Sequence, residues 1–245
     1  MSPSRPELVK LASHRCHSEP IDLSVMGNHI TVGDLMRGPF MLEYTADPPT
    51  LTEVARTYQS IWSTAVEMLD KDTVINCDAE GNLSVWQRDD ALLVADQRRL
   101  RLIADMRLGE VVNRIRRLDV PAHHLMADAP LQPTAYIATV EGSVYLLASI
   151  SEAKTQQLLQ LQSNLAKVVM SPGDLEFNRW RAYASPARVG EEPYRFVDGD
   201  FLERFLALPM HEAEKVVAGV DSEHFALGVG VDAARALVES LRMFY

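Results

Sequence analysis

The sequence predicts a mainly β protein with an α-helical C-terminal domain. Three segments share one pattern, in which a β-rich run is followed by a tight turn ending in glycine and then by a second β-rich run. The turn glycines are Gly38, Gly81 and Gly142. After Ser149 the spacing of apolar residues changes from two to about 3.6, the period of an α-helix. We therefore expect a β domain over residues 1–149 and a helical domain over residues 150–245.

The spacing of the turn glycines favours the blades of a β-propeller. Gly38 and Gly81 are 43 residues apart, within the period typical of four-stranded blades. Gly142 follows after 61 residues, which predicts an insertion at about residues 89–98. The β domain has room for three to four blades, whereas a propeller needs about four to eight to cover its strand edges. The sequence therefore predicts a partial, WD40-like propeller.

Alternating apolar residues and turn signals place the β elements in order along this domain. They are a strand at 21–25, a hairpin at 30–44, strands at about 52–58 and 62–69, a hairpin at 73–87, strands at about 99–107 and 111–117, and a hairpin at 136–148. Each hairpin contains one of the three glycine turns. We expect these strands to form the three to four blades.

The region after Ser149 carries the signals of several short helices. Ser149 and Glu152 form a capping-box pattern, and the apolar residues that follow share one helix face up to a stop at Pro172. These apolar residues are Leu158, Leu161, Leu165, Val168 and Val169. Further helices are expected to begin at Asp200, Pro209 and Asp232. Phe205 is expected to point inward from the first of these three helices.

Composition excludes several classes of protein. The chain has 245 residues, is 47% hydrophobic and carries a net charge of −10. A negative charge disfavours direct binding to nucleic acid, because phosphate contacts require clustered Lys and Arg. Cys16 and Cys77 lie far apart without metal-ligand spacing, which favours free thiols in a reducing compartment. No signal peptide and no run of about 18 apolar residues occurs, so secretion and membrane insertion are not expected.

Catalytic motifs are incomplete wherever they begin. His211 opens a zinc-binding helix pattern, but Lys215 stands where the second histidine ligand is required. His123 and His124 lie in a proline-rich loop without a nucleophile or a third metal ligand at a usable spacing. These patterns predict a binding scaffold that is not an enzyme and that holds no cofactor or metal.

Two features leave alternatives open on spacing alone. Several arginines cluster in sequence, and alternate strand positions would place some of them on one face, as a solvated outer strand or as a nucleic-acid surface. They are Arg98, Arg99, Arg101, Arg107, Arg114, Arg116 and Arg117. Trp62 stands just before a predicted strand. It could pack between blades or lie at a binding interface, where Trp is enriched.

Several longer motifs resemble one family. They are Ile30-Thr-Val-Gly-Asp-Leu-Met-Arg37, Ala55-Arg56, Trp62-Ser-Thr-Ala-Val-Glu-Met-Leu-Asp70, Gly81-Asn-Leu-Ser-Val85, Leu108-Gly-Glu-Val-Val-Asn113 and Phe196-Val-Asp-Gly-Asp-Phe-Leu-Glu-Arg-Phe-Leu206. From about residue 14 to the C-terminus the chain resembles the family of the large subunit of the UV-damaged DNA-binding complex. That subunit is an adaptor of cullin-RING ubiquitin ligases. Its relatives are the large subunit of the cleavage and polyadenylation factor and a propeller subunit of a splicing factor.

The resemblance implies a scaffold for protein contacts in ubiquitination and DNA repair, in the nucleus and the cytoplasm. It implies three propellers in a full protein, of which this chain matches the later part of the third and the C-terminal helical domain. The remaining propellers of the adaptor would be partners, and the cullin would be held only indirectly, because the propeller that binds it is not matched here. A polyadenylation or splicing subunit is the alternative, and a truncated fragment without independent function is another.

The resemblance also implies a partner-binding site. In the family, substrate receptors insert a helical motif into a cleft between the first and third propellers. The positions that match this cleft are Trp62, Asn113, Val140 and Leu23, with Arg37 and Arg56 on its rim and Val111 where the family usually has phenylalanine. Apolar anchors flanked by Asn and Arg suit an amphipathic helix, because the polar side chains orient what the apolar ones bind.

Overall fold

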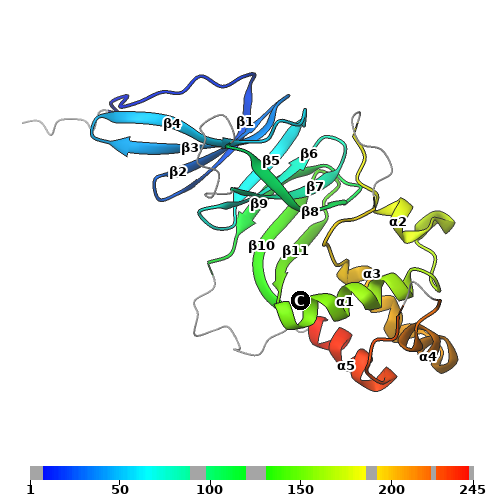
Figure 1. Cartoon of the computed structure of the whole chain (residues 1–245). Coiled ribbons are helices and arrows are strands. Elements are labelled where there is room, and N and C mark those ends of the chain that lie inside the picture. The colour runs from blue at the N-terminus through cyan, green and yellow to red at the C-terminus, as the bar shows by residue number, and fades with distance from the viewer. Residues whose placement is uncertain (1–7, 89–97, 120–130, 186–191, 222–224, 243–245) are drawn as a thin grey trace, which may run out of the picture.

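The computed structural model describes residues 8–88, 98–119, 131–185, 192–221 and 225–242. Within these ranges the strands form three antiparallel sheets, which follow one another along the chain (Figure 1). The first sheet contains β1 (Pro20–Met26), β2 (His29–Asp34), β3 (Gly38–Ala46) and β4 (Pro49–Arg56). The second contains β5 (Ser63–Met68), β6 (Thr73–Asp78), β7 (Asn82–Arg88) and β8 (Leu100–Arg107). The third contains β9 (Val112–Arg117), β10 (Leu131–Thr139) and β11 (Val144–Ile150).

The three sheets are successive blades of a partial propeller. In each sheet the strands are ordered as they occur in the chain, starting from β1, β5 or β9. These three first strands contact one another, β1 with β5 and β5 with β9. They therefore line the inner side of the array, and the later strands extend outward. The predicted partial propeller is confirmed, with three blades in the described residues.

The glycine turns of the three hairpins adopt the conformation that their sequence predicts. Gly38, Gly81 and Gly142 have φ values of 72°, 76° and 96°, a region that glycine enters without the steric cost of a Cβ atom. An acidic side chain stabilises the first two turns. Oδ1 of Asp34 accepts hydrogen bonds from the backbone N–H groups of Met36 and Arg37, and Asp78 plays the same part in the second turn.

Apolar side chains fill the spaces between adjacent blades. One core cluster joins the first two blades and is centred on Met41, Met68 and Trp86. A second cluster joins the second and third blades and includes Ile75 and Ile137. Alternate residues of each strand point to opposite faces, so every blade offers one face to each neighbour. This is how the sequence converts period-two patterning into stacked blades.

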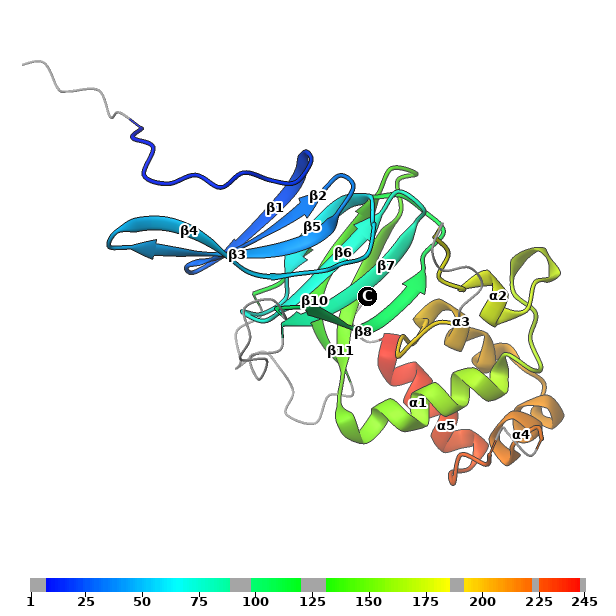
Figure 2. The ribbon, with the colours of Figure 1, turned by 45° about the horizontal axis from the view of Figure 1, so that its top comes forward.

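The C-terminal part is helical and lies beside β8 and β11 (Figure 2). Its elements are α1 (Glu152–Leu165), α2 (Phe177–Trp180), α3 (Gly199–Glu203), α4 (Met210–Ala218) and α5 (Val231–Leu241), with 3-10 turns at Pro172–Asp174 and Arg204–Ala207. They enclose one core whose fully buried members include Leu158, Leu161, Leu165, Phe201 and Phe205. The predicted inward face is confirmed for Leu158, Leu161 and Leu165, and so is the burial of Phe205. The helix was predicted too long, because α1 ends at Leu165 and the partly buried Val168 and Val169 follow it.

Two predicted helix caps are wrong. Ser149 belongs to β11, the N-cap of α1 is Ser151, and no side chain caps that helix. Asp198, and not Asp200, caps α3 by accepting a hydrogen bond from the Phe201 N–H. Both motifs predicted a helix that exists, but each placed the N-cap two residues away from the observed one. A cap depends on where the backbone leaves its extended conformation, and the residue pattern alone does not fix that point.

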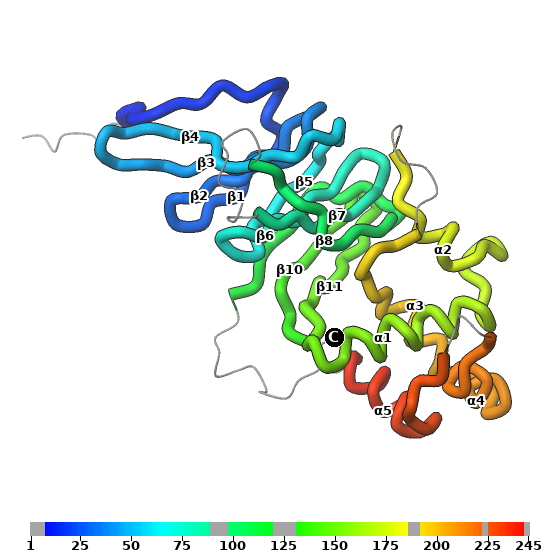
Figure 3. The backbone as a smooth tube through the Cα atoms, viewed as in Figure 1, coloured from blue at the N-terminus to red at the C-terminus, as the bar shows by residue number. Residues whose placement is uncertain are grey.

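The helical part is joined to the second blade by the backbone between α2 and α3, which returns to β8 (Figure 3). Asp105 and Tyr194 exchange backbone N–H to carbonyl hydrogen bonds of 2.9 and 2.8 Å. The Asn82 side chain also bonds to the backbone of Ala184, donating at 2.6 Å and accepting at 3.1 Å. The described helices therefore form a unit fixed to the blades.

Candidate protein-binding surface

One end of the strand array gathers the hairpin turns and the loops between blades. Because neighbouring strands run antiparallel, the three glycine turns and the links after β4 and β8 all fall at this end. Backbone hydrogen bonds connect them: Gly38 N–H donates to Ile61 at 2.9 Å, Leu108 N–H to Gly81 at 2.8 Å, and Val140 N–H to Val111 at 2.9 Å. We call this end the turn surface; it comprises residues 35–38, 56–62, 79–81, 108–113 and 140–143.

Six of the seven residues expected at a partner site lie on the turn surface. Trp62, immediately before β5, is 56% exposed, and Val140 is 65% exposed. Asn113 and Arg37 are also exposed, whereas Val111 and Arg56 are partly buried. An exposed tryptophan on a hydrogen-bonded turn is available to a partner. The contribution of these six residues to binding stays a prediction.

Leu23 lies apart from the other six. It stands in the middle of β1, is 59% exposed, and borders a pocket of about 320 Å³ on the inner strands together with Val66 and Ile115. The same pocket is crossed by the ion pair between Arg114 and Asp22, at 3.1 Å. The structure therefore places Leu23 on the open inner side of the blades.

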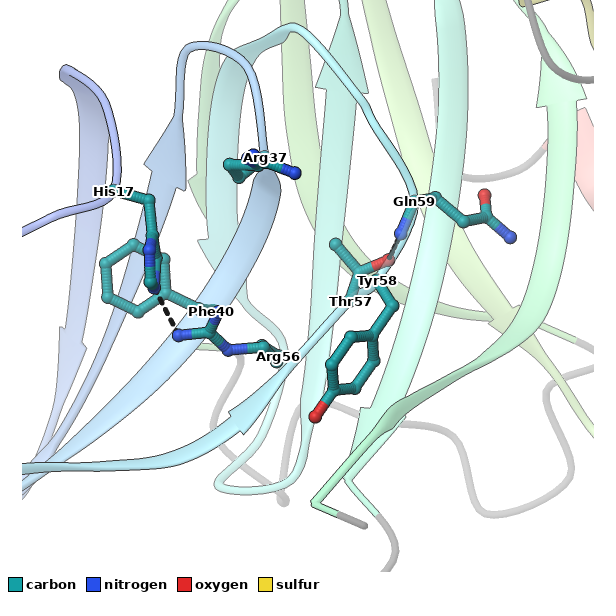
Figure 4. A pocket seen from close by; sticks show the side chains of 7 residues that line it. All are labelled: His17, Arg37, Phe40, Arg56, Thr57, Tyr58 and Gln59. Atoms are coloured by element: carbon teal, nitrogen blue, oxygen red, sulfur yellow. Dashed lines mark hydrogen bonds between the residues drawn. The ribbon is translucent and has the colours of Figure 1, made fainter. Parts of the chain in front are cut away.

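Arg37 and Arg56 line a pocket of about 260 Å³ at the edge of the turn surface (Figure 4). Arg56 is already engaged: its guanidinium donates to the Glu53 carboxylate and lies against the His17 ring. The hydrogen bond to Glu53 raises the pKa of Arg56. Arg37 is exposed, so it is the arginine better placed to meet an acidic group of a partner.

Glu110 is a member of this surface that the sequence analysis did not single out. Its carboxylate accepts hydrogen bonds of 2.7 Å from the hydroxyls of Thr139 and Tyr145. These bonds, that from Thr139 foremost, lower the pKa of Glu110. The sequence offered one hint of this role. In the third turn Thr139 stands where Asp34 and Asp78 stand in the first two, so the third turn lacks their carboxylate, and Glu110 supplies one from the neighbouring loop. Glu110 thus orders the third turn beside Val140.

The arginine cluster does not form one basic face. Arg101 and Arg107 lie on β8, the outermost strand of the second blade, whereas Arg114 and Arg116 lie on β9, the innermost strand of the third. Acidic side chains also neutralise part of the set, since Arg114 pairs with Asp22 and Arg117 with Asp119. Alternation does place Arg114 and Arg116 at alternate exposed positions of β9, but the cluster as a whole is divided between two blades.

Metal and membrane sites are not found in the part of the chain that the structure describes. No group of three His, Cys, Asp or Glu side chains there could hold a metal ion. His123 and His124 lie outside the described residues. None of the described helices is both long and apolar enough to cross a membrane. Burial raises the pKa of the Cys77 thiol, so this cysteine stays in its neutral, unreactive form.

The fold and this surface define a propeller-type β scaffold with a helical C-terminal part. The family model described as the CPSF A subunit region matches residues 3–207. The chain therefore belongs to this family.

Curated relatives carry the name DNA damage-binding protein 1. The protein of Oryza sativa subsp. japonica is 30% identical over 236 residues, which cover 96% of this chain and 21% of the relative. DNA damage-binding protein 1a of Arabidopsis thaliana is 31% identical over 211 residues, covering 86% and 19%. The chain thus spans about a fifth of the length of the relatives it matches. The resemblance read from the motifs is confirmed.

Proposed function

We propose that this chain is a non-enzymatic scaffold that binds other proteins through its turn surface, in a complex that serves the response to DNA damage. The observation that carries the proposal is Trp62, a residue of a motif that resembles the family's, which is 56% exposed and whose carbonyl accepts a hydrogen bond from Ala79 N–H at 2.9 Å. A large aromatic side chain exposed at the centre of a polar surface is typical of a binding hot spot. The names of the relatives support the link to DNA damage.

The partner that fits this surface is an amphipathic helix of a substrate receptor. Trp62 and Val140 supply apolar anchors, and Asn113 and Arg37 supply donors that orient a helix whose other face is polar. Val111 fills its position with a smaller side chain than phenylalanine, which makes the pocket shallower. On this proposal residues 1–149 carry the binding blades and residues 150–245 form the helical domain that supports them.

The chain covers about a fifth of its relatives, so the proposal extends to further parts of an adaptor. Other propellers of the adaptor would complete the cleft, the cullin would join only through them, and the complex would act in the nucleus and the cytoplasm. Direct contact with nucleic acid is not part of the proposal, because the net charge is −10 and the arginines are divided between two blades.

A second candidate is a subunit of a polyadenylation or splicing complex, which the description of the matched family favours. A third is a fragment that has no independent function. Affinity purification of the tagged chain from its own cells, followed by mass spectrometry, separates the three. A cullin with propeller-type receptors supports the ligase adaptor, RNA-processing subunits support the second candidate, and no specific partner supports the third.

The purification also tests the surface when it is repeated with Trp62→Ala. The proposal expects the receptors to be lost and subunits bound elsewhere on the chain to be retained. Phe225→Ala is the matched control, because Phe225 is 67% exposed and lies in the helical part, away from the turn surface. Equal loss of receptors from both variants would remove the turn surface from the proposal.

A further inference from the structure

The pocket at the edge of the turn surface gathers positive charge, although the chain as a whole carries a net charge of −10. Its volume is about 260 Å³, and the residues that line it are His17, Arg37, Phe40, Arg56, Thr57, Tyr58 and Gln59 (Figure 4). We call it the arginine pocket. Its two arginines come from separate segments of the first blade, so the fold brings them together.

Arg37 reaches the pocket from the turn between β2 and β3. Its backbone is held in place, because its N–H donates to Oδ1 of Asp34 at 3.0 Å. Its side chain is exposed, and the guanidinium has no hydrogen bond or ion pair with any residue that the structure describes. An arginine with a fixed backbone and an unengaged guanidinium is available to a ligand.

Arg56, the last residue of β4, supplies the second guanidinium. Nε and Nη2 donate to the carboxylate of Glu53, and Nη2 also contacts Nε2 of His17. These contacts fix the plane of the guanidinium. They leave Nη1 without a partner among the described residues, so Nη1 can donate to a ligand while the ion pair with Glu53 persists.

Two further arginines border the pocket just before β8. The Arg56 N–H donates to the Arg98 carbonyl at 3.2 Å, which holds this segment against the end of β4. The guanidinium of Arg98 donates to the Glu53 carbonyl at 3.2 Å. The guanidinium of Arg99 lies 5.1 Å from the centre of the Tyr58 ring. Because Tyr58 lines the pocket, Arg99 adds positive charge at its rim.

Positive charge exceeds negative charge around the pocket. The arginines that line or border it are Arg37, Arg56, Arg98 and Arg99. In the described part of the chain, the carboxylates that contact them are those of Glu53 and Asp34. Asp34 is fully buried and accepts the hydrogen bonds of its own turn. A concave site with this balance favours an anionic ligand.

We propose that the arginine pocket binds a phosphorylated side chain of a protein partner. A phosphate monoester carries nearly two negative charges and three acceptor oxygens at neutral pH. It can therefore accept from Arg37 and from Nη1 of Arg56 at the same time, whereas a carboxylate has one charge and two oxygens to share. Converging arginines with paired N–H donors are the usual means by which proteins recognise phosphorylated residues.

The pocket is a better fit for a protein segment than for nucleic acid. A nucleic acid needs a row of cations that follows successive phosphates. Arg101, the next arginine along β8, is bonded to Gln87, and Arg114 and Arg116 lie on the inner strand of another blade. The pocket therefore offers one phosphate site. This inference deepens the proposed function and rests on it, since it adds a charged contact to the surface that carries Trp62.

Peptide pools test the chemistry of the ligand on the full chain. Each pool contains short peptides with randomised flanks and a central phosphoserine, serine or glutamate. The phosphoserine pool is expected to bind at least about tenfold more tightly than the other two, because it alone fills both donor sites. Equal binding of the phosphoserine and glutamate pools would overturn the assignment to phosphate. Tighter, Arg37-dependent binding of a single-stranded oligonucleotide would overturn the assignment to a protein partner.

Variants test the place of binding. Arg37→Ala is expected to weaken binding of the phosphoserine pool about tenfold or more and to keep its melting temperature, since the guanidinium has no partner among the described residues. Arg101→Ala is the matched control, because it removes the same charge from an exposed arginine outside the pocket. Equal loss from both variants would overturn the site. Arg37→Lys keeps the charge without the paired donors and should restore only part of the affinity; full recovery would overturn the paired geometry.

The pools contain no receptor sequence, so their result is separate from the test of the receptor surface. The link between the two is made by affinity purification of the tagged chain from its own cells. Partners that are lost after phosphatase treatment and from Arg37→Ala support a phosphorylated contact. Partners that survive both treatments but are lost from Trp62→Ala would overturn this contact and leave the proposed function standing.

Discussion

Arg181 and Asp198 form a buried ion pair that joins the helical part to the second blade. Nε of Arg181 donates to Oδ2 of Asp198 at 2.7 Å, and each side chain is only 6% exposed. The same guanidinium donates to the carbonyl of Leu108 at 2.7 Å and stacks on the ring of Trp180, 3.6 Å from its centroid. Asp198 in turn caps α3. One arginine therefore connects the ends of two helices, α2 and α3, to the turn surface at Leu108.

Replacing Arg181 by alanine is expected to destabilise the chain strongly. The change leaves the Asp198 carboxylate buried without its cation and the Leu108 carbonyl without a donor, and breaking a buried pair in this way typically costs about 3–5 kcal/mol. Urea denaturation measures the loss. Arg114→Ala is the control, since its pair with Asp22 is 46% exposed at the arginine and should contribute at most about 1 kcal/mol. Equal losses from both variants would show that burial does not govern the pair.

The glycine turns predict a graded response to alanine. A Cβ on Gly81 would lie 3.2 Å from the backbone N of Glu110, whereas one on Gly142 would meet nothing within 4 Å. Both residues have positive φ, which costs a non-glycine residue about 1–2 kcal/mol. Gly142→Ala should therefore cost about that much, and Gly81→Ala about 2–4 kcal/mol because the contact adds strain. Thermal melts compare the two, and a larger effect at Gly142 would contradict the turn geometry.

Glu110 predicts an acid-sensitive contribution to stability. Hydrogen bonds from Thr139 and Tyr145 lower its pKa in the folded chain, so folding favours the ionised form. This stability is present at pH values above the ordinary glutamate pKa of about 4.3 and is lost as the pH falls through the lowered value. The free energy of unfolding of Glu110→Gln should therefore fall below that of the unchanged protein at neutral pH, with a difference that shrinks below about pH 4. Glu214→Gln, at an exposed glutamate of α4, should show no such dependence, and a difference at Glu110 that is constant with pH would exclude the mechanism.

The blades could be predicted from sequence because their signals are local. Alternation, glycine turns and the 43-residue spacing locate Gly38 and Gly81 and the strands around them. The contacts that join the helical part to the second blade could not be predicted in this way. Arg181 bonds to the Leu108 carbonyl and Asn82 to Ala184, and in each pair the two residues are far apart in the sequence. The cap predictions were wrong for another reason. Ser149 and Asp200 are good capping residues, but Ser149 lies within β11 and Asp198 is the residue that caps α3.

The candidate site could be predicted in part. Six of the residues proposed from family motifs lie on the turn surface. They do so because alternate connections between antiparallel strands fall at the same end of the strand array. Leu23 does not join them, since it lies in the middle of a strand and not at its end. Glu110 was missed because its role depends on Tyr145, which only the third hairpin brings within 2.7 Å.

The core of the helical part is tested at Phe205, which is fully buried and packs among the helices. Phe205→Ala removes most of a large side chain from this core and should cost about 3–5 kcal/mol. Phe225→Ala is the control of the same type, because Phe225 is 67% exposed. Chemical denaturation followed by circular dichroism measures both. A loss below about 1 kcal/mol at Phe205 would contradict the packing of that helix face.

Trp62 separates binding from stability, because the chain offers a second tryptophan in the opposite environment. Trp62 is 56% exposed, whereas Trp86 is 2% exposed and donates its indole N–H to Ser84 at 2.9 Å. Trp86→Ala should therefore cost about 3–5 kcal/mol of folding stability. Trp62→Ala should hardly change the melting temperature, yet weaken receptor binding by about 2 kcal/mol or more, as expected for a central aromatic anchor.

The two readouts must be taken on the same Trp62 variant. Binding is measured by titrating a purified candidate receptor into the chain assembled with the further propellers that the proposed function assigns to its complex, and folding by a thermal melt of that assembly. A low melting temperature with unchanged affinity would assign Trp62 to packing between blades. Val140, 65% exposed and hydrogen-bonded to Val111 at 2.9 Å, would then be the remaining apolar anchor. An unchanged melting temperature with lost affinity places the receptor helix against Trp62. The unchanged melt would show that the indole does not stabilise the fold, so the lost affinity would come from lost contact with the receptor.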